Sequence, residues 1–379
     1  MDIVVLCDPG CEGVATRDVE ELLHKVSDPR HGFVIVRDCS PEEMALLSYR
    51  SQAASRILAY IADGELEGVD DILASKEALL AFDYAPFLPK KGSFRVRCER
   101  HGDHAFSAKE VEETLGGVLH EEKQFMVKLA VPDVTVWCAI MDECYVLGID
   151  LSGRDLGKRT YRVFHTRRSL RGTIAYAAVR SANHTGKERM VDPFCTDGAL
   201  AIEAALFVTR TPVQKFTKEY FFTEMPFAKE KDWDAFFEAE DKQGGKMDAN
   251  LTAFASSVHG VKKTRGNAKL AGVDKSFTVT KASVDWLDTK LGESSVDLVV
   301  TQPPCSGKNT PLKDVEKLQD DLFYQCRYVL KPTGTVLLVA EKKAEFLNAA
   351  ERHSFSLKEE KEVHMGGTVL KFLVFGKIK

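Results

Sequence analysis

The stretch Met190-Val191-Asp192-Pro193-Phe194-Cys195-Thr196-Asp197-Gly198 decides the fold of the second half of the chain. Its first residues form the end of a short predicted strand, and the apolar stretch Ala199–Val208 behind it is a predicted helix. From about residue 169 onward helices and strands alternate in this way, which is typical of a doubly wound α/β sheet. Near-continuous apolar runs predict further buried strands at Val296–Val300, Thr335–Ala340 and Val369–Phe375.

Two smaller α/β modules are predicted before this sheet in the sequence. In residues 1–64 short β-rich runs alternate with helical patterns, and one helix is predicted to open at Pro41, behind the N-cap Ser40, and to extend as far as Leu58. In residues 65–153 a predicted helix follows the capping box that Ser107 and Glu110 form. The strands predicted in this second module are Phe94–Cys98, Val134–Ile140 and Tyr145–Ile149.

The composition bounds the class of protein. The chain has 379 residues, of which 44% are hydrophobic and 29% charged, and its formal net charge is −5. At about 100–200 residues per domain, this length predicts two or three domains. The net charge excludes a uniformly basic nucleic-acid coat, although a local basic patch remains compatible with it.

The cysteines, the histidines and the start of the chain exclude further classes. The nine cysteines are scattered without any C-x-x-C pair, which excludes a zinc ribbon and argues against a disulfide framework. No histidine has metal-ligand spacing with another ligand type, so we expect no metal site. The first residues lack the pattern of a signal peptide, and no apolar run approaches the roughly 18 residues of a membrane helix. We therefore expect a cytoplasmic protein.

A basic segment separates the second module from the doubly wound part of the chain. Residues 154–171 hold seven Lys and Arg residues, the single acid Asp155 and the aromatic residues Tyr161 and Phe164. Such runs are usually solvated linkers, but the length of this one, its aromatic residues and its position between two domains favour contact with phosphates. The residues predicted to contact RNA are Arg154, Lys158, Arg159, Arg162, Arg167, Arg168 and Arg171.

Short motifs in a fixed order across nearly the whole chain carry a resemblance to one family. They are Asp8–Glu12, Phe94–Arg97 with His104–Ser107 and Glu110–Glu112, Lys128-Leu129 with Pro132–Val134 and Gly148–Gly153, Asp192–Cys195 with Gly198 and Ile202–Ala205, and Asn267-Ala268 with Ala271–Val273. Together they resemble the THUMP-domain RNA methyltransferases that methylate the N2 amine of guanine in tRNA.

The resemblance implies a division of labour among three domains. It implies a ferredoxin-like N-terminal domain in residues 1–64 and, in residues 65–153, a THUMP domain that grips the acceptor end of tRNA by shape. After a basic linker at 154–168, it implies a Rossmann-like class I methyltransferase domain in residues 169–379 that binds S-adenosylmethionine. A duplex can be held by scattered phosphate contacts without the whole protein being basic. Residues 210–250 look like an insertion, whose aromatic side chains either pack together or stack on RNA.

The resemblance also implies cofactor-binding residues, and here the chain departs from the family. The implied residues are Asp192, Phe194, Cys195, Thr196, Asp197, Gly198, Ser256 and Ser283. The family has Gly-Ser-Gly where this chain has Thr196-Asp197-Gly198. We expect the Cβ atom of Thr196 to crowd the methionine moiety and the charge of Asp197 to repel its carboxylate.

Two acids that the family uses are also missing. The acid that accepts from the ribose hydroxyls falls within Phe254–Ser257, and the acid that reads adenine falls at Ala282-Ser283. Each lost charge-assisted hydrogen bond is worth about 1.5–3 kcal/mol. We therefore expect affinity for S-adenosylmethionine to be weaker by roughly 10²–10⁴.

The predicted target-base loop holds the implied catalytic residues Gln302, Pro303, Pro304 and Cys305. In the family an Asp or Asn and a main-chain carbonyl accept from the amine, and an aromatic residue after the two prolines stacks on the flipped base. Gln302 offers its amide oxygen one methylene farther out. Cys305 cannot stack, which forfeits about 1–3 kcal/mol.

Three functions remain open at this point. The first is an active tRNA guanine-N2 methyltransferase. The second is a catalytically inactive paralogue that binds RNA, with a protein partner or an active subunit. The third follows from Pro304–Gly307, which resembles the Pro-Cys-Ser-Gly loop of RNA cytosine-C5 methyltransferases, in which a cysteine thiolate attacks the base. An unreactive cysteine in a turn is the other interpretation of Cys305.

Overall fold

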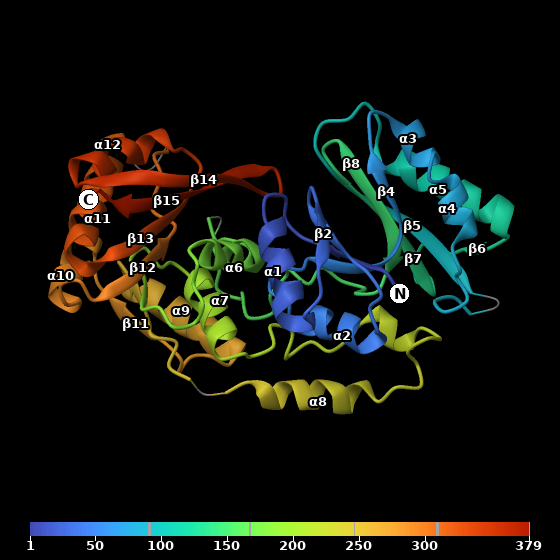
Figure 1. Ribbon diagram of the computed structural model, residues 1–379, viewed down its shortest axis with the longest axis horizontal. Helices are drawn as coiled ribbons and strands as arrows, with labels where there is room; N and C mark the ends of the chain where they lie inside the picture. Colours follow the sequence, from blue (N-terminus) through green and yellow to red (C-terminus); the bar gives the residue numbers. More distant parts are fainter. Residues whose placement is uncertain (90–91, 167, 246, 308–310, 379) are drawn as a thin grey trace. The chain divides into compact units, whose positions relative to one another are not determined.

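The computed structural model describes residues 1–89, 92–166, 168–245, 247–307 and 311–378. The chain divides into two compact units, which Figure 1 shows coloured by sequence. The first unit comprises Met1–Leu156 and Thr217–Glu238, and the second comprises Gly157–Phe216 and Ala239–Lys379. No helix within the described residues is long and apolar enough to cross a membrane.

The first unit is built on one eight-stranded sheet with the order β2-β3-β1-β4-β8-β7-β5-β6. The long strand β4 pairs with both β1 and β8, so the sheet runs without a break through both predicted N-terminal domains. The predicted boundary at residue 64 stays a prediction. The strands are β1 (Ile3–Leu6), β2 (Ser27–Arg30), β3 (Phe33–Val36), β4 (Arg56–Glu65), β5 (Ser93–His101), β6 (Met126–Val127), β7 (Val134–Met141) and β8 (Cys144–Asp150).

Two helices of the first unit, those at Pro41 and after Ser107, begin where the sequence predicts them. The predicted capping box of Ser107 and Glu110 is present, and the predicted N-cap Ser40 forms a second capping box with Glu43. The helix that opens at Pro41 is shorter than predicted, because it ends at Arg50 and Leu58 lies in the buried centre of β4. The helices are α1 (Glu12–Leu23), α2 (Pro41–Arg50), α3 (Val69–Leu73), α4 (Lys76–Ala81) and α5 (Ala108–Lys123).

The predicted insertion contributes a segment to the first unit. Residues 217–238 belong to this unit and contain the 3-10 helix η1 (Phe221–Glu224) and the start of α8 (Trp233–Gln243). The rings of Phe222 and Trp233 lie 5.0 Å apart, and the ring of Phe237 lies 4.7 Å from that of Tyr49. Most of these aromatic side chains are therefore packed together rather than presented to solvent.

The second unit contains a seven-stranded sheet with the order β11-β10-β9-β12-β13-β15-β14. Strands β9 to β13 are parallel, and β15 runs antiparallel between β13 and β14. This is the doubly wound Rossmann-like architecture that the sequence predicts. The strands are β9 (Met190–Asp192), β10 (Leu251–Ala255), β11 (Thr278–Lys281), β12 (Val296–Thr301), β13 (Leu330–Ala340), β14 (Phe355–Met365) and β15 (Thr368–Lys377).

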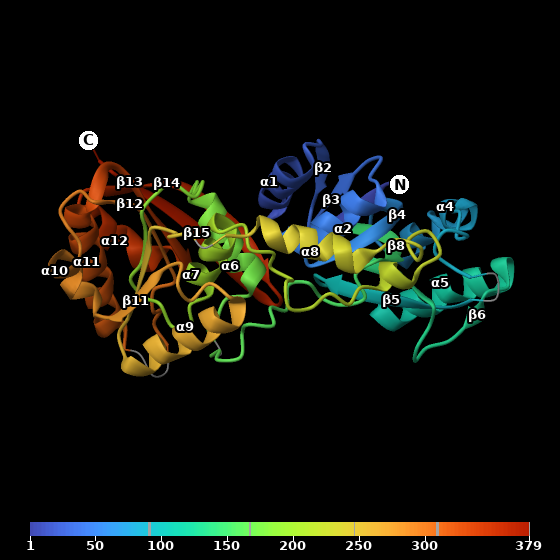
Figure 2. The same cartoon turned by 90° about the horizontal axis from the view of Figure 1, so that it is seen from below.

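Helices cover both faces of this second sheet (Figure 2). On one face lie α6 (Gly172–Ser181), α7 (Ala199–Val208) and α9 (Val258–Ala271), and on the other lie α10 (Leu287–Lys290), α11 (Leu312–Val329) and α12 (Ala344–Arg352), with the 3-10 helix η2 (Val284–Trp286) before α10. The chain order reverses between β9 and β12. Ligands of such sheets bind beyond the carboxyl ends of the strands at this reversal.

Candidate active site

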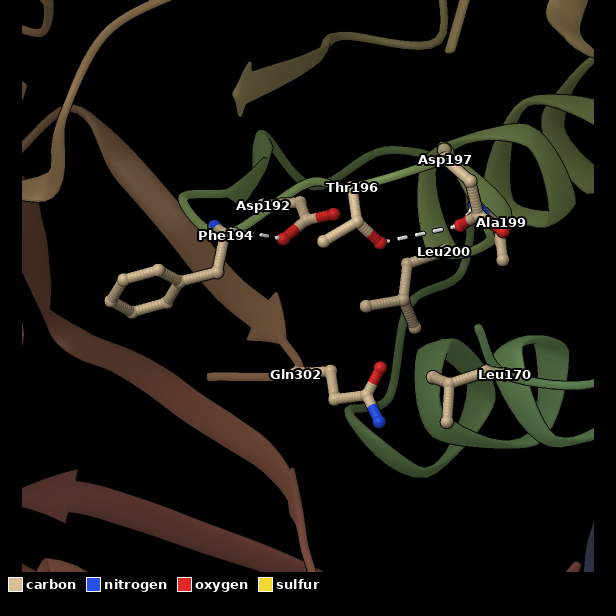
Figure 3. Close-up of a pocket in the computed structure, with 9 residues that line it drawn as sticks. Leu170, Asp192, Phe194, Thr196, Asp197, Ala199, Leu200 and Gln302 are labelled. Atoms are coloured by element: carbon tan, nitrogen blue, oxygen red, sulfur yellow. Dashed lines mark hydrogen bonds between the residues drawn. The ribbon is translucent and has the colours of Figure 1, made fainter. Parts of the chain in front are cut away.

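A pocket lies at the carboxyl ends of β9 and β12 (Figure 3). Asp192, Thr196 and Asp197 lie along one wall, and Gln302 and Leu170 lie along the opposite one. The cavity measures about 10 Å³, which is room for roughly one water molecule. The lining residues are Leu170, Asp192, Phe194, Thr196, Asp197, Gly198, Ala199, Leu200 and Gln302. The structure thus brings five of the predicted cofactor residues together with one predicted catalytic residue.

Asp192 is the last residue of β9 and is buried. Its Oδ1 atom accepts hydrogen bonds from the Thr301 hydroxyl at 2.6 Å and from the Phe194 amide at 3.2 Å. Burial raises the pKa of Asp192 to about 7, against the lowering effect of these two hydrogen bonds. A carboxyl group held where its charged form is costly, at the rim of a pocket, indicates a functional position.

Asp197 is the second acid of the pocket, and its side chain lacks a full set of partners. The residue is 3% exposed, and its Oδ1 atom accepts only long hydrogen bonds from the Ala199 amide at 3.4 Å and from the Thr196 hydroxyl at 3.5 Å. Its Oδ2 atom is buried without a hydrogen-bond partner among the described residues. Because an unpaired buried carboxylate oxygen is costly, this atom points to a ligand that donates a hydrogen bond or carries positive charge.

The turn between β9 and α7 needs its one glycine. Gly198 has φ +89°, and a Cβ atom on it would lie 2.7 Å from the Thr264 side chain of α9. On the same side, the Cys195 sulfur lies 3.3 Å from the Thr264 hydroxyl, and burial raises the pKa of this thiol. Cys195 therefore packs the turn against α9 and does not line the pocket.

Asn267 of α9 fixes this turn and is a residue of the site that its sequence position did not predict. Its Nδ2 atom donates to the carbonyl oxygens of Asp197 at 2.9 Å and Phe164 at 3.1 Å, and its Oδ1 atom accepts from the Phe164 amide at 3.0 Å. The side chain thereby ties the basic segment to the turn of the pocket. The sequence signal is the motif Asn267-Ala268, which carries part of the family resemblance but gives no sign of these hydrogen bonds.

The two predicted serines lie apart from the pocket. Ser256 follows β10 and Ser283 follows β11, and both are exposed. The neighbouring Ser257 hydroxyl accepts from the Gly260 amide and so caps α9. No carboxylate occupies the position after β10, as the sequence analysis predicts from the residues 254–257.

The predicted target-base loop leaves β12 after Thr301. Gln302 lines the pocket, while Pro303 is buried and Pro304 is half-buried. The Pro303 carbonyl oxygen accepts a hydrogen bond from the Arg168 guanidinium at 3.3 Å. The basic segment thus also reaches the second wall of the site.

Cys305 lies in an environment that does not activate a thiol. Burial raises the pKa of Cys305, and the nearby positive charge of Arg168 only opposes this effect. Its sulfur donates to the Pro303 carbonyl oxygen at 3.8 Å. Since the thiolate is the nucleophile, a raised pKa disfavours attack on a base.

One predicted RNA contact, Arg159, is wrong. This side chain is buried and forms an ion pair with Glu203 of α7, in which its Nε atom lies 2.8 Å from Oε1. The Tyr161 hydroxyl donates to the same oxygen at 2.7 Å. A phosphate cannot reach a guanidinium enclosed in this way. The error arises because Glu203, an acid in a helix distant in sequence, provides the partner.

The other basic residues differ in exposure. Lys158 and Arg168 are exposed, and Arg154, Arg162 and Arg171 are half-buried. The Arg154 guanidinium donates to the carbonyl oxygens of Thr217 and Glu219. Arg167 lies outside the described residues.

Comparison with known proteins identifies the families of both parts of the chain. Residues 159–371 match the family model of the RMKL-like methyltransferase domain, and residues 71–150 match that of the THUMP domain. A curated relative from Archaeoglobus fulgidus, named tRNA (guanine(6)-N2)-methyltransferase, is 25% identical over 97% of this chain and 90% of its own length. A relative of the same name from Methanocaldococcus jannaschii is 25% identical and covers 97% of both chains.

Solved structures share the fold over the whole chain. SMU.472, a putative methyltransferase complexed with SAH, has a TM-score of 0.79 at 17% identity and covers 100% of this chain and 98% of its own. TrmN from Thermus thermophilus has a TM-score of 0.70 at 24% identity and covers 100% of this chain and 99% of its own. The fold and the motifs together lead to one conclusion: the chain belongs to the RMKL-like methyltransferase domain family and carries a THUMP domain, as its sequence predicts.

Proposed function

We propose that this protein transfers a methyl group from S-adenosylmethionine to the N2 amine of a guanine in tRNA. The observation that supports this function is the pocket in which the turn after β9 faces Gln302 at the end of β12. Relatives named for that activity align with nearly the whole chain. We further propose the acceptor end of tRNA as the part that the THUMP domain binds, and the cytoplasm as the location.

The pocket residues fit the methionine end of S-adenosylmethionine. That end carries a positively charged sulfonium, which supplies the methyl group, and a positively charged ammonium. Asp192 and Asp197 place two carboxyl groups on one wall, and the Oδ2 atom of Asp197 is buried without a described partner. Opposite charge complements this acidic wall. The expected repulsion between Asp197 and the methionine carboxylate opposes this attraction.

The site offers fewer charged groups to the nucleoside end of S-adenosylmethionine. Ser256 and Ser283 offer neutral hydroxyl groups where two carboxylates would bind ribose and adenine. We therefore still expect the affinity for S-adenosylmethionine to be weaker by roughly 10²–10⁴ than that of a site with both acids.

Gln302 and the Pro303 carbonyl oxygen are the groups that would hold the guanine amine. Both are acceptors, and an amine has two N–H donors, so together they would orient its nitrogen. Gln302 is neutral and does not take up a proton, so its role is positioning. The Pro303 carbonyl oxygen also accepts a hydrogen bond from the Arg168 guanidinium. Binding of the amine would share or replace this hydrogen bond.

A catalytically inactive RNA-binding protein is the second candidate. The small cavity and the absence of an acid after β10 favour it. In that case the methyltransferase domain would serve as a scaffold, with a protein partner supplying any activity. Nucleophilic chemistry at Cys305 has no such support, because its pKa is raised.

Titration calorimetry with S-adenosylmethionine, followed by methyl transfer to unmodified tRNA, separates the two candidates. We expect binding in the high micromolar range and slow methyl transfer. Gln302→Ala should bind S-adenosylmethionine as the wild type does and lose methyl transfer, because Gln302 contacts the base. Binding of tRNA without any binding of S-adenosylmethionine would instead support the inactive protein.

A further inference from the structure

Helix α9 carries an unbalanced positive charge. Its sequence, Val258–Ala271, contains Lys262, Lys263, Arg265 and Lys269 and no acid, although the whole chain has a net charge of −5. Lys262, Arg265 and Lys269 are exposed, and Lys263 is half-buried. Spacings of three and four residues place the exposed three on one face, over about 10 Å of helix.

None of these four side chains forms an ion pair with any residue that the structure describes. The Arg265 guanidinium donates to the Val279 carbonyl oxygen at 3.2 Å, which orients the group without cancelling its charge. Helix α11 differs in composition, because acids, Asp314 and Glu316, stand between its exposed Lys313 and Lys317. The positive charge of α9 is therefore available to a partner.

Two exposed aromatic rings sit against glycines of the same helix. Phe164 is 46% exposed, and its ring covers Gly266, where a Cβ atom would lie 2.7 Å from it. Phe216 is 59% exposed and approaches Gly272, the residue that caps α9. We call Phe164, Phe216, Lys262, Lys263, Arg265 and Lys269 the α9 surface.

The opposite side of α9 holds the turn of the candidate active site. Thr264 packs against Gly198 and Cys195, and Asn267 binds the Asp197 carbonyl oxygen. The side chain of Asn267 also forms two hydrogen bonds with the main chain of Phe164. The α9 surface therefore lies on one side of helix α9, and the turn of the pocket lies on the other. The basic segment contacts the helix through Phe164.

We propose that the α9 surface binds the phosphate backbone of the RNA substrate. Lysine and arginine side chains without acidic partners gain counterion-release free energy from phosphates. Exposed aromatic rings beside them add surfaces on which nucleotides stack, a combination that favours nucleic acid over an acidic protein. The identity of the RNA as tRNA rests on the proposed function, but the binding step does not depend on catalysis.

The test is the salt dependence of the affinity of the full chain for an unmodified tRNA transcript. For Lys262→Glu/Lys269→Glu we expect the slope of log K against log salt to flatten by up to ~2, about one per lost phosphate contact. The affinity should fall at least about tenfold at low salt. Lys262→Arg/Lys269→Arg should keep the wild-type slope, and binding of S-adenosylmethionine should be unchanged in both variants.

Lys313→Glu/Lys317→Glu on α11 is the matched control, because it changes the net charge by the same amount. An unchanged slope in the α9 variant would overturn the inference, as would an equal change in the α11 control. Absence of any wild-type binding to tRNA would overturn it too. If the α9 variant flattens the slope and the wild type transfers no methyl group, only the proposed catalytic function fails.

Discussion

Two buried acids, Asp192 and Asp197, line the same pocket and are the ionisable groups of the candidate site. Each is costly to bury, since Asp192 has a pKa raised by desolvation and Asp197 has an oxygen without a described partner. Acids placed at such cost and facing a cavity are typical of ligand sites, which trade stability for function. We therefore expect substitutions of these residues to change both stability and ligand binding.

The raised pKa of Asp192 predicts a pH-dependent stability. The folded-state pKa of about 7 exceeds the ordinary value of 3.8, so the protonated carboxyl stabilises the fold below about pH 4, and this contribution is lost as pH rises to about 7. Asp192→Asn removes the titration. Its free energy of unfolding relative to wild type should rise between pH 4 and pH 7.5, by on the order of 4 kcal/mol. Urea denaturation at several pH values measures this difference, and a difference independent of pH would contradict the assignment.

Restoring an acid after β10 should strengthen cofactor binding. Ser256→Asp places a carboxylate at the position where the ribose hydroxyls are expected, and we predict at least about tenfold higher affinity for S-adenosylmethionine by calorimetry. Ser257→Asp is the matched control, because it adds the same charge one residue later and keeps a capping side chain on α9. Equal gains in both variants would mean that general charge, rather than a ribose contact, is responsible.

Sequence reasoning found the residues of the site that lie in local motifs and missed those brought together by folding. Asp192 and Gln302 stand at predicted strand ends, so their meeting follows from the parallel sheet. Thr301 and Asn267 hold this site through hydrogen bonds to residues 70 or more positions away, which no local pattern shows. The burial of Arg159 escaped prediction for the same reason.

At the scale of elements, the junction between α6 and α7 depends on close packing around a buried ion pair. A Cβ atom at Gly172, the first residue of α6, would lie 2.5 Å from Arg159 and 2.6 Å from the Glu203 carboxylate. Neither side chain of that pair is exposed, so neither can move aside. Glycine is required here by space rather than by backbone conformation.

Gly172→Ala should therefore destabilise the protein by about 1–3 kcal/mol, as overpacking of a tight site does. Gly117→Ala in α5 is the control, because nothing lies within 4 Å of a Cβ atom there. In the middle of a helix this control should be stabilising by about 0.5–1 kcal/mol. Denaturant midpoints of both variants check the prediction. An unchanged free energy of unfolding in Gly172→Ala would show that the Arg159 and Glu203 side chains can move apart from the added Cβ atom.

Strands that consist of long apolar runs were predicted well. Strands with many charged residues, or with helix-forming residues beside them, were not. Strand β14 has five charged residues in a row at its centre and escaped prediction, because it pairs only with β15 at the edge of the sheet and buries few side chains. The alanines before β4 made it read as a continuation of α2, although Leu58 belongs to a strand paired on both sides. Tertiary pairing overrides helical periodicity at this point.

At the scale of the whole molecule, a net negative chain carries its positive charge locally. The basic segment from Lys158 onward and α9 provide such charge within the second unit, and Asn267 ties one to the other. Long-range electrostatic attraction to RNA then depends on the distribution of charge and not on its total. Composition alone predicted that a basic patch was allowed, but only the structure located it on α9.

The most direct test of the account identifies the product nucleoside. Unmodified tRNA is incubated with the protein and S-adenosylmethionine carrying a deuterated methyl group, at a concentration that calorimetry shows to be saturating, and the digested tRNA is analysed by mass spectrometry. We expect labelled N2-methylguanosine with the wild-type protein and none with Gln302→Ala. Label in 5-methylcytidine, or no labelled nucleoside at all from a protein with bound cofactor and bound tRNA, would contradict it.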